Sequence, residues 1–307
     1  MPKVIVLGSA NLDFTVAVER LPTVGETVLG QEFYQSYGGK GANQAVAATR
    51  AGAEVVLLTM LGTDDYGRRI EQHLTSIGLP REGLLRHPTK PTGVALILVD
   101  EGGRNLIAVA PGSNQMLSLE DIQRASPLIA QGAVLLAQLE VPLAVVQEAF
   151  SIAKANGLLT ILNPAPVAPL LPPLLKLVDI LTPNEGEAHT LSGMTDPAEA
   201  ARVLVEQGAR SVVVTLGERG AFLRDATTTT RLFPAYPVQA IDSTAAGDAF
   251  NGALACSMAE GRSLKDAVVF ANAAGALATT KRGAQESLPT RTEIDRLYHG
   301  SQVAPCD

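Results

Sequence analysis

The chain has 307 residues, 46% of them hydrophobic and 18% charged, and 24 Lys and Arg stand against 31 Asp and Glu, which gives a net charge of -7. This acidic balance argues against a nucleic-acid surface, because binding along a phosphate backbone needs clustered basic side chains. The two cysteines, Cys256 and Cys306, have neither CxxC nor Cys/His spacing, which argues against a disulfide framework and a zinc site. The composition therefore favours a small-molecule substrate.

The first apolar run, at 4–7, is too short for a signal peptide, and no apolar stretch approaches the length of a membrane span. We therefore expect a cytoplasmic protein. Further apolar runs alternate with helical patterns along the chain. The runs lie at 54–60, 133–136, 158–162, 179–181 and 211–215, and the helical patterns at 42–51, 67–77, 143–156, 197–207, 249–260 and 264–279. This alternation predicts an α/β fold with a mostly parallel sheet covered on both faces, whose ligands gather at the carboxyl ends of the strands.

Two regions interrupt this alternation. The segment 15–37 contains strand-like pieces separated by Pro22 and Gly25, and the segment 93–110 has two apolar runs on either side of the pair Gly102-Gly103. The second pattern predicts a β-hairpin. Both regions could form a small β layer outside the main sheet, as a lid or a dimer surface. Ordinary edge strands of the main sheet remain the alternative.

A glycine-rich segment, Gly38-Gly39-Lys40-Gly41-Ala42-Asn43, precedes the first helical pattern. Its glycines permit close approach of a ligand, while Lys40 and Asn43 supply polar groups. It is not a Walker A loop, because Gly41 follows Lys40 where Ser or Thr is required. A plain glycine-rich turn at the start of a helix is the alternative.

Two later segments also follow apolar runs. Asn184 and Glu187 stand three residues apart, a spacing that suits either the water shell of Mg²⁺ or an ordinary capping box. The segment 215–220 contains two glycines that could let the backbone approach a nucleotide, although many turns have this pattern. Glu140 is an acidic residue at the end of a predicted strand. The four histidines have no HExxH or triad context and are predicted to be surface residues.

The segment 242–250 is the most informative, because it combines small residues with two acids and opens into a helix. The backbone N–H groups of Ala245, Ala246 and Gly247, at the positive end of that helix, could surround an anion. Asp248 would then lie beside the anion, where it could accept a proton from a hydroxyl that attacks phosphorus. Taken alone, the segment is equally compatible with a capped helix.

Together these segments resemble the ribokinase (PfkB) family of carbohydrate kinases, from about Val4 to about Leu297. The segments 38–43 and 242–248 are similar to its two signature motifs. Shorter similarities lie at 11–13, 25–27, 139–140, 163–166, 182–185 and 281–285. The resemblance implies a three-layer α/β sandwich with a small β-sheet lid. It also implies one domain over 1–307, lid strands inserted at about 14–37 and 92–110, and a homodimer formed through those strands.

The implied activity is phosphorylation of D-ribose at its 5-hydroxyl by ATP, with Mg²⁺ and activating K⁺. Asp248 would be the base, and Ala245, Ala246 and Gly247 would form the anion hole. The implied sugar ligands are Asn11, Asp13, Gly38, Gly39, Lys40, Asn43 and Glu140. The implied nucleotide ligands are Asn184, Thr215, Gly217, Glu218, Gly220, Gly247 and Asn272. Glu187 would order water around Mg²⁺, and the implied K⁺ ligands are Asp242, Thr244, Ala278, Lys281, Gly283 and Ser287.

The chain departs from the family pattern at two positions. Ala245 stands where the family often has glycine, and we expect its methyl group to be tolerated provided that the backbone angles are ordinary. Asn272 occupies a variable position, which weakens its assignment to the nucleotide. Two other functions remain open: a kinase for another sugar or nucleoside, such as deoxyribose, fructose or a pseudouridine-like nucleoside, and a non-catalytic sensor of sugar or nucleotide.

Overall fold

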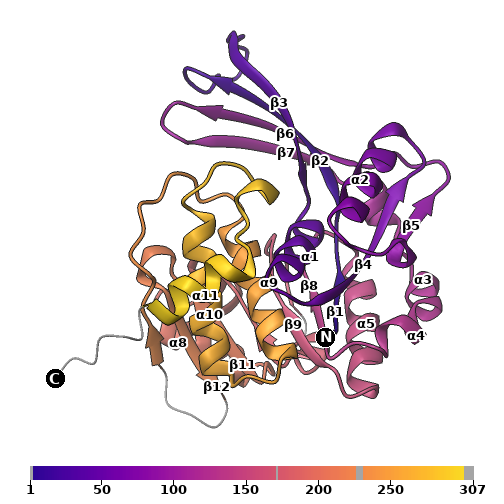
Figure 1. Ribbon diagram of the computed structural model, residues 1–307, viewed down its shortest axis with the longest axis vertical. Coiled ribbons are helices and arrows are strands. Elements are labelled where there is room, and N and C mark those ends of the chain that lie inside the picture. The colour runs from indigo at the N-terminus through magenta and orange to yellow at the C-terminus, as the bar shows by residue number, and fades with distance from the viewer. Residues whose placement is uncertain (1–2, 171, 226–230, 301–307) are drawn as a thin grey trace.

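The computed structural model describes residues 3–170, 172–225 and 231–300, so Cys306 and the threonine run at 227–230 lie outside the described residues. A nine-stranded sheet lies between two layers of helices, and a four-stranded sheet stands off one end of this body (Figure 1). The predicted three-layer α/β architecture with a second, smaller sheet is confirmed. No described helix is long and apolar enough to span a membrane.

The large sheet has the order β13-β12-β11-β10-β9-β8-β1-β4-β5. From β11 to β5 the strands run parallel to one another, as the alternating pattern predicted. Strand β12 runs antiparallel to both of its neighbours, β11 and β13. Sequence analysis missed β12 and β13, and a tight turn joins β11 to β12. The strands are β1 Lys3–Leu7, β4 Glu54–Gly62, β5 Leu84–His87, β8 Val134–Ala137, β9 Leu159–Leu162, β10 Ile180–Leu181, β11 Ser211–Thr215, β12 Ala221–Asp225 and β13 Arg231–Phe233.

Each face of the sheet packs against its own layer of helices, because successive strand side chains point to opposite faces. In β1, Val4 and Val6 belong to one apolar core, and Ile5 and Leu7 belong to the other. The first core is covered by α1 Lys40–Arg50, α2 Asp65–Ser76, α9 Ala246–Ala259, α10 Leu264–Ala278 and α11 Arg291–Gly300. The second is covered by α3 Leu119–Arg124, α4 Ser126–Ile129, α5 Leu143–Ala155, α6 Pro172–Leu175, α7 Glu185–Ser192 and α8 Pro197–Glu206.

The second sheet has the order β3-β2-β6-β7, with β2 Asn11–Val18, β3 Gly30–Gly38, β6 Gly93–Asp100 and β7 Asn105–Ala110. Strands β6 and β7 form the hairpin that the sequence predicted. Strand β2 pairs with β3 and β6, so these segments are not edge strands of the large sheet. Because β2 begins at Asn11, earlier than the predicted 15, both Asn11 and Asp13 belong to the second sheet.

Helices α1 and α9 pack with their backbones close together. A Cβ atom added to Gly252 of α9 would lie 2.5 Å from Ala47 Cβ and 2.7 Å from the carbonyl oxygen of Gln44, both in α1. Only glycine permits this approach, since such distances are too short for a real Cβ. The side chains that these two helices project toward each other are therefore brought within hydrogen-bond reach.

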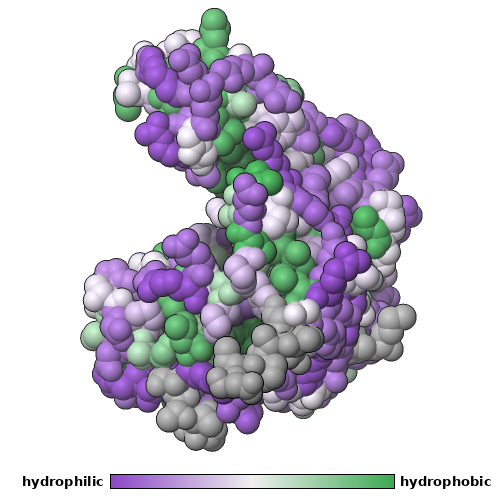
Figure 2. Space-filling view, turned by 60° about the vertical axis from the view of Figure 1, so that its left-hand side comes forward, coloured by the Kyte–Doolittle hydropathy of each residue, from purple (hydrophilic) through white to green (hydrophobic). Residues whose placement is uncertain are grey.

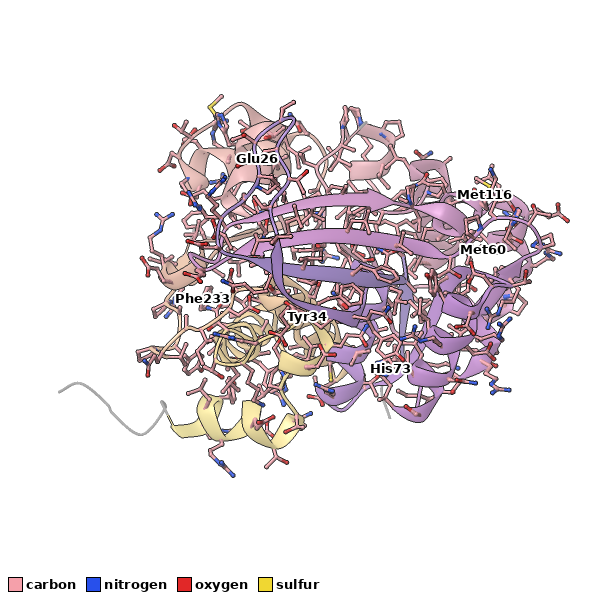
Figure 3. The ribbon with its side chains drawn as sticks, turned by 90° about the horizontal axis from the view of Figure 1, so that it is seen from above. Glu26, Tyr34, Met60, His73, Met116 and Phe233 are labelled. Carbon is pink, nitrogen blue, oxygen red and sulfur yellow. The ribbon has the colours of Figure 1, made fainter. Side chains whose placement is uncertain are left out.

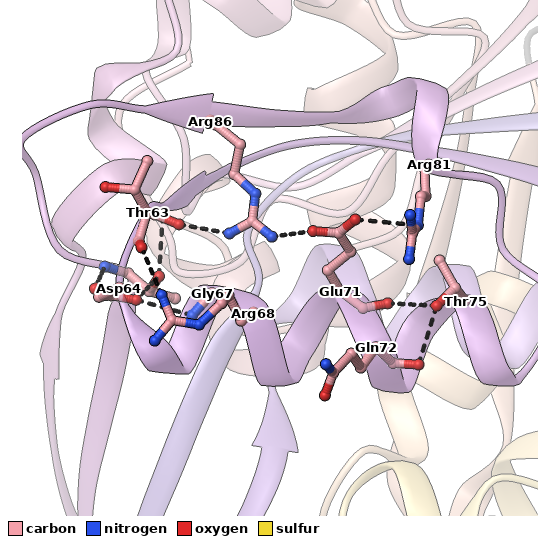
Figure 4. A network of polar contacts seen from close by, with 11 residues as sticks. Thr63, Asp64, Gly67, Arg68, Glu71, Gln72, Thr75, Arg81 and Arg86 are labelled. Carbon is pink, nitrogen blue, oxygen red and sulfur yellow. Dashed lines mark hydrogen bonds and ion pairs between the residues drawn. The ribbon is translucent and has the colours of Figure 1, made fainter.

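Helix α2 is held firmly at its start and along its length (Figure 4). Asp64 caps the helix by accepting a hydrogen bond from Gly67 N at 2.8 Å. Glu71 forms ion pairs with Arg81, at 3.1 Å, and with Arg86, whose Nη1 also donates to the carbonyl oxygen of Gly62 at 2.5 Å. These contacts fix α2 relative to strands β4 and β5.

Candidate active site

The carboxylate of Asp248 lies in the first turn of α9, 7% exposed, and faces α1. Asn43 Nδ2 donates to its Oδ2 at 3.0 Å, and Gln44 Nε2 donates to its Oδ1 at 2.9 Å. Burial raises the pKa of Asp248, the charge of Lys40 and the two amides lower it, and Glu140 raises it, with a net rise. The site thus contains a buried, oriented carboxyl group whose affinity for a proton is above that of an ordinary aspartate.

A network of buried amides extends from Gln44. Its Nε2 also donates to Asn163 Oδ1 at 3.0 Å, and its Oε1 accepts from Gln138 Nε2 at 2.6 Å. Asn163 in turn donates to the carbonyl oxygen of Thr182 at 3.1 Å. Sequence analysis assigned no role to Gln44 or Gln138. The signals in the sequence that could have pointed to them are that Gln44 directly follows Asn43 and that Gln138 directly follows β8.

Asn11 and Asp13 stand two residues apart on β2. Asn11 Oδ1 accepts from Asn114 Nδ2 at 2.8 Å, and Asn114 Oδ1 accepts from Ala10 N at 3.0 Å, so a residue missed by sequence analysis fixes the Asn11 amide. Asp13 Oδ1 is buried and has no hydrogen-bond partner among the described residues. A buried oxygen of this kind is costly unless a ligand supplies a donor, as a hydroxyl group would.

Burial raises the pKa of Asp13 to about 7, and the negative charges of Glu140 and Glu286 add to the rise. Gly38 lies opposite Asn11 across the β2–β3 pair, and a Cβ atom at position 38 would collide with the Asp13 carboxyl group. The glycine predicted as a sugar ligand therefore makes room for the Asp13 side chain.

Lys40 and Glu140 meet at the start of α1. Glu140 Oε2 accepts hydrogen bonds from Lys40 N at 3.0 Å and from Ser9 Oγ. Gly39 precedes the helix with a φ of 88°, which glycine adopts without strain. Burial acts to lower the pKa of Lys40, but the charges of Asp248, Glu140 and Glu187 outweigh it, and the pKa is raised. Lys40 is thus a cation facing three acids from three separate segments.

Ala245 has a left-handed backbone, with φ 58° and ψ 9°, and is the one residue other than glycine with positive φ in the described part of the chain. The condition under which the methyl group was expected to be tolerated, ordinary backbone angles, is therefore not met. For a residue with a Cβ, this conformation costs about 1–2 kcal/mol. The turn therefore stores strain directly before the first turn of α9.

The N–H groups at the start of α9 form the positive end of the helix macrodipole. Gly247 is exposed, and among the described residues no atom beyond its immediate neighbours in the chain and its own helix backbone lies within 4 Å of the position of a Cβ there. Ala246 N donates to the carbonyl oxygen of Ser243 at 3.2 Å, closing the preceding turn. The open surface at Gly247, next to the buried Asp248, is where an anion can approach this helix terminus.

The predicted nucleotide residues lie after β10 and β11. Asn184 caps α7 in a capping box, with Asn184 Oδ1 accepting from Glu187 N and Glu187 Oε2 accepting from Asn184 N, both at 2.8 Å. Each side chain keeps a second polar atom for a ligand. Burial raises the pKa of Glu187 above its usual value, although Asn184 N and Lys40 act in the opposite direction.

Asn184 also forms a β-bridge with Thr215, which brings the two strand ends together. Beyond Thr215, Gly217 and Gly220 have φ values of 60° and 97°, and Glu218 is exposed. Asn272 is buried on α10, and its Nδ2 donates to the carbonyl oxygens of Phe233 at 3.1 Å and Pro234 at 3.3 Å. Asn272 therefore anchors the segment after β13, and only its Oδ1 is left for a ligand.

The predicted potassium residues lie on two loops that bind each other. Asp242 Oδ1 accepts from Thr244 N at 2.9 Å, and its Oδ2 accepts from Gly283 N at 3.0 Å. Burial opposes the charged form of Asp242, but the hydrogen bonds from Thr244 and Gly283 and the charge of Arg282 lower its pKa. Asp242 is therefore an anion. Of the remaining members, Ala278 ends α10, Lys281 follows it, and Ser287 is buried in the short 3-10 helix Gln285–Ser287.

No group of three or more His, Cys, Asp or Glu side chains suited to a metal ion occurs within residues 3–170, 172–225 and 231–300. An ion held at these loops would be bound chiefly by backbone carbonyl oxygens. Carbonyls, a hydroxyl and one carboxylate form a hard oxygen set, and this chemistry fits an alkali cation.

His73 was predicted to be a surface residue, and this was wrong. It is half-buried, and its ring stacks on Tyr37 with 3.8 Å between centroids and 7° between planes. His73 Nε2 also lies 2.8 Å from Gln285 Oε1. Of the other three, His189 and His299 are exposed as predicted, and His87 is half-buried.

Figure 2 shows a deep, open cleft between the second sheet and the body of the molecule. Four of the residues that the sequence singled out, Asp13, Lys40, Asn43 and Asp248, lie on elements where the two parts meet. Asp13 comes from the second sheet, and Asp248 comes from α9. Lys40, Asn43 and Gln44 come from α1. The charges of Glu140, Glu187 and Asp248 all raise the pKa of Lys40, so these groups lie close to it.

The model of the family described as pfkB family carbohydrate kinase matches residues 1–291. The chain is 41% identical to the ribokinase of Haemophilus influenzae over 300 residues, covering 96% of this chain and 98% of that protein. It is 35% identical to the deoxyribokinase of Salmonella typhi, covering 94% and 95%. The structure of the ribokinase of Arabidopsis thaliana with ribose and ATP matches with a TM-score of 0.88 and 30% identity, covering 97% and 98%.

The pKa of Asp13 predicts a pH-dependent loss of stability. Between about pH 4 and pH 7 the folded protein retains a proton on Asp13 that the unfolded chain releases, so the free energy of unfolding falls as the pH rises. Asp13→Asn removes this contribution. We expect the stability of the variant relative to the original protein to increase from pH 4 to pH 7 and then to level off, as measured by urea unfolding.

Asp65→Asn, at an exposed position in the first turn of α2, serves as the control for loss of one negative charge. A constant stability difference between Asp13→Asn and the original protein over this pH range would contradict the assignment.

Proposed function

Because the chain belongs to the pfkB family of carbohydrate kinases, we propose that it transfers the γ-phosphoryl group of ATP to the 5-hydroxyl of D-ribose. The observation that carries this proposal is the buried carboxyl group of Asp248 at the N-terminus of α9, held by two amides and facing Lys40. A base at a helix N-terminus places proton acceptance next to anion binding.

The proposed reaction is a single displacement at phosphorus. The ribose 5-oxygen forms a bond to the γ-phosphorus while the bond from that phosphorus to the β–γ bridging oxygen breaks, and ADP leaves. The hydroxyl proton passes to Asp248 as charge develops. Asn43 and Gln44 hold the carboxylate in one orientation, and the raised pKa favours its acceptance of the proton. Most of the rate enhancement would come from this positioning.

The transferring phosphoryl group would lie against the N–H groups of Ala245, Ala246 and Gly247. Their fixed dipoles stabilise charge that grows on the phosphoryl oxygens in the transition state. Ala246 N is engaged with Ser243, so Gly247, which is exposed, is the most accessible of the three in this structure. Lys40 adds a positive charge on the side of Asp248 and Glu140.

Sugar specificity would come from polar groups that are left unpaired by a poor substrate. Asp13 Oδ1 is buried and has no partner within the part of the chain that the structure describes, Asn11 is fixed by Asn114, and Glu140 is fixed by Lys40 N. An analogue that lacks a hydroxyl group would leave such groups unsatisfied, which is strongly selected against. This supports ribose over deoxyribose. The similarity to a deoxyribokinase keeps deoxyribose as the second candidate.

For the nucleotide, we propose contacts with Asn184, Thr215, Gly217, Glu218, Gly220 and Asn272. The bridge between Asn184 and Thr215 and the glycine turn after β11 support a backbone surface that a flat base could approach. Mg²⁺ would lie between the phosphates and the carboxylate of Glu187, which orders its water shell. The positive charge of Lys40 acts on the carboxylate of Glu187, and this proximity supports a place for Glu187 near the phosphates.

We propose that K⁺ binds between the loops at 242–244 and 278–287. The ion would fix the turn that carries Ala245, whose left-handed backbone needs support from its surroundings. The mutual hydrogen bonds of Asp242 with Thr244 and Gly283 support a preformed site.

We further propose one domain over 1–307, in which the inserted strands at about 14–37 and 92–110 form a lid and pair with a second copy. The support is the exposed apolar surface on one face of the second sheet, which includes Phe33, Leu96 and Leu106. Contiguous exposed apolar surface of this kind marks an interaction site. The location in the cytoplasm stays a prediction from the sequence.

A coupled assay of ADP release over a panel of sugars and nucleosides tests the function. We expect the highest kcat/KM for D-ribose, and lower values for deoxyribose, fructose and pseudouridine because they lack hydroxyl groups or differ in shape. A higher kcat/KM for any other member of the panel would reassign the substrate.

Asp248→Asn is the matched variant in the same assay. We expect it to fold and to bind ATP and sugar, while kcat falls by about 10²–10⁴ through loss of the base. Circular dichroism and equilibrium binding check the fold and both ligands. A folded variant with unchanged turnover would rule out the proposed base, and ligand binding without turnover in the original protein would indicate a sensor.

Replacing K⁺ by Na⁺ at constant ionic strength tests the ion site. We expect kcat to fall several-fold for the original protein, because the smaller ion cannot reach all the carbonyl oxygens of a site shaped for K⁺. Asp242→Asn should weaken the activation by K⁺. Equal activity in the two salts would remove the ion from the mechanism.

Sedimentation at micromolar concentration tests the pairing of the second sheet. We expect a dimer, and we expect Leu106→Asp, at an exposed position of β7, to give a monomer because a buried unpaired charge is costly. Leu119→Asp, at a comparably exposed position of α3, is the control and should remain dimeric. A monomeric original protein would refute the pairing.

A further inference from the structure

A chain of hydrogen bonds, buried except at its last, partly buried contact, leads from Asp248 to His73, a residue with no role in the proposed reaction. Asn43 Nδ2 donates to Asp248, and Asn43 Oδ1 accepts from Gln285 Nε2 at 3.1 Å. Gln285 Oε1 then lies 2.8 Å from His73 Nε2. Gln285 is 2% exposed, so it has no access to solvent that could replace either contact.

The direction of every bond in this chain follows from the carboxylate at its end. An ionised carboxylate only accepts hydrogen bonds, so Asn43 must turn its Nδ2 toward Asp248 and its Oδ1 away. That Oδ1 needs a donor, which requires Nε2 of Gln285. The Oε1 of Gln285 must then accept from His73, which requires a proton on His73 Nε2. Both the neutral ring protonated at Nε2 and the imidazolium meet this requirement.

Without the chain, the orientation of the Asn43 amide would be only weakly determined. A rotation of the amide by 180° exchanges its oxygen and nitrogen at almost the same shape. The rotated amide would present Oδ1 to the carboxylate of Asp248, and two acceptors would face each other in a buried site. Gln285 prevents the rotation only while its own amide is held by His73.

His73 is well placed to hold this end of the chain. Figure 3 labels it on α2, the helix fixed at Asp64 and Glu71. Its ring stacks on Tyr37 of β3, and Tyr37 is paired with Leu12, between Asn11 and Asp13 on β2. The chain therefore connects the second sheet, through α2 and the loop at 283–287, to the carboxylate on α9.

We propose that His73 and Gln285 are positioning residues, which act through Asn43 to hold the carboxylate of Asp248 in the orientation that receives the proton. Neither touches the reacting atoms. The proposal rests on the assignment of Asp248 as base, and predicts a loss in kcat with little change in KM, because a misaimed base slows the chemical step and leaves substrate contacts in place.

Three variants test the proposal. Gln285→Glu cannot donate to Asn43 Oδ1, so the Asn43 amide rotates, and we expect kcat to fall by about ten- to a hundredfold. His73→Leu keeps the bulk of the side chain and removes the donor, and we expect a smaller fall, about tenfold. His73→Gln restores a donor from Nε2 but lacks the aromatic ring, and we expect kcat to return to within about threefold of the original value.

The comparison of His73→Gln with His73→Leu separates hydrogen bonding from packing. Equal losses in both variants, a rise in KM at constant kcat, or an unchanged kcat in His73→Leu would each overturn the proposal. Should Gln285→Glu fail to fold, the two His73 variants still decide. Failure of the proposed function has a different signature: the original protein would be inactive on the whole panel, or Asp248→Asn would be active.

Discussion

The close contact between α1 and α9 is the constraint on which the rest of the site depends. Gly252 lets the two backbones meet with no side chain between them, so the distance between the amides on α1 and the carboxylate on α9 is set by main-chain packing. That contact brings Asn43 and Gln44 to 3.0 and 2.9 Å from Asp248. Packed interiors deform little, and a geometry fixed in this way is available before any ligand binds.

This arrangement holds unfavourable features close to one another. The carboxylate of Asp248 is buried, and an oxygen of Asp13 lacks a partner within residues 3–170, 172–225 and 231–300. Ala245 has a strained backbone, while Lys40 offsets part of the negative charge. Each feature lowers the stability of the free protein, and each is relieved or used by a ligand of matching chemistry: a donor for Asp13, an anion at the start of α9. Their concentration at one cleft is typical of a functional site.

Local patterns were sufficient to predict the parallel sheet and the hairpin of the second sheet, and they singled out the segments 38–43 and 242–248. They could not reveal Asn114 or Gln138, whose roles depend on partners 103 and 94 residues away. Gln285 meets Asn43 across 242 residues, and His73 looked like a surface histidine because its partners come from two other elements. The backbone of Ala245 was also beyond prediction, since its angles are imposed by the turn and not by its own preference.

The start of β2 at Asn11 has a mechanical consequence. Only residues 8–10 separate β1 of the large sheet from β2 of the second sheet, and Gly8 N still bonds to the carbonyl oxygen of Leu58 in β4. A tilt of the second sheet would have to bend this short link as well as the connections at Gly39, 88–92 and Pro111, so residues 8–10 would form one part of the hinge. Asn11 and Asp13 lie just past the hinge, whereas Asp248 belongs to the fixed side. Closing the cleft would therefore carry the sugar toward its base through a short arc, since a point next to a pivot moves least and keeps its direction best.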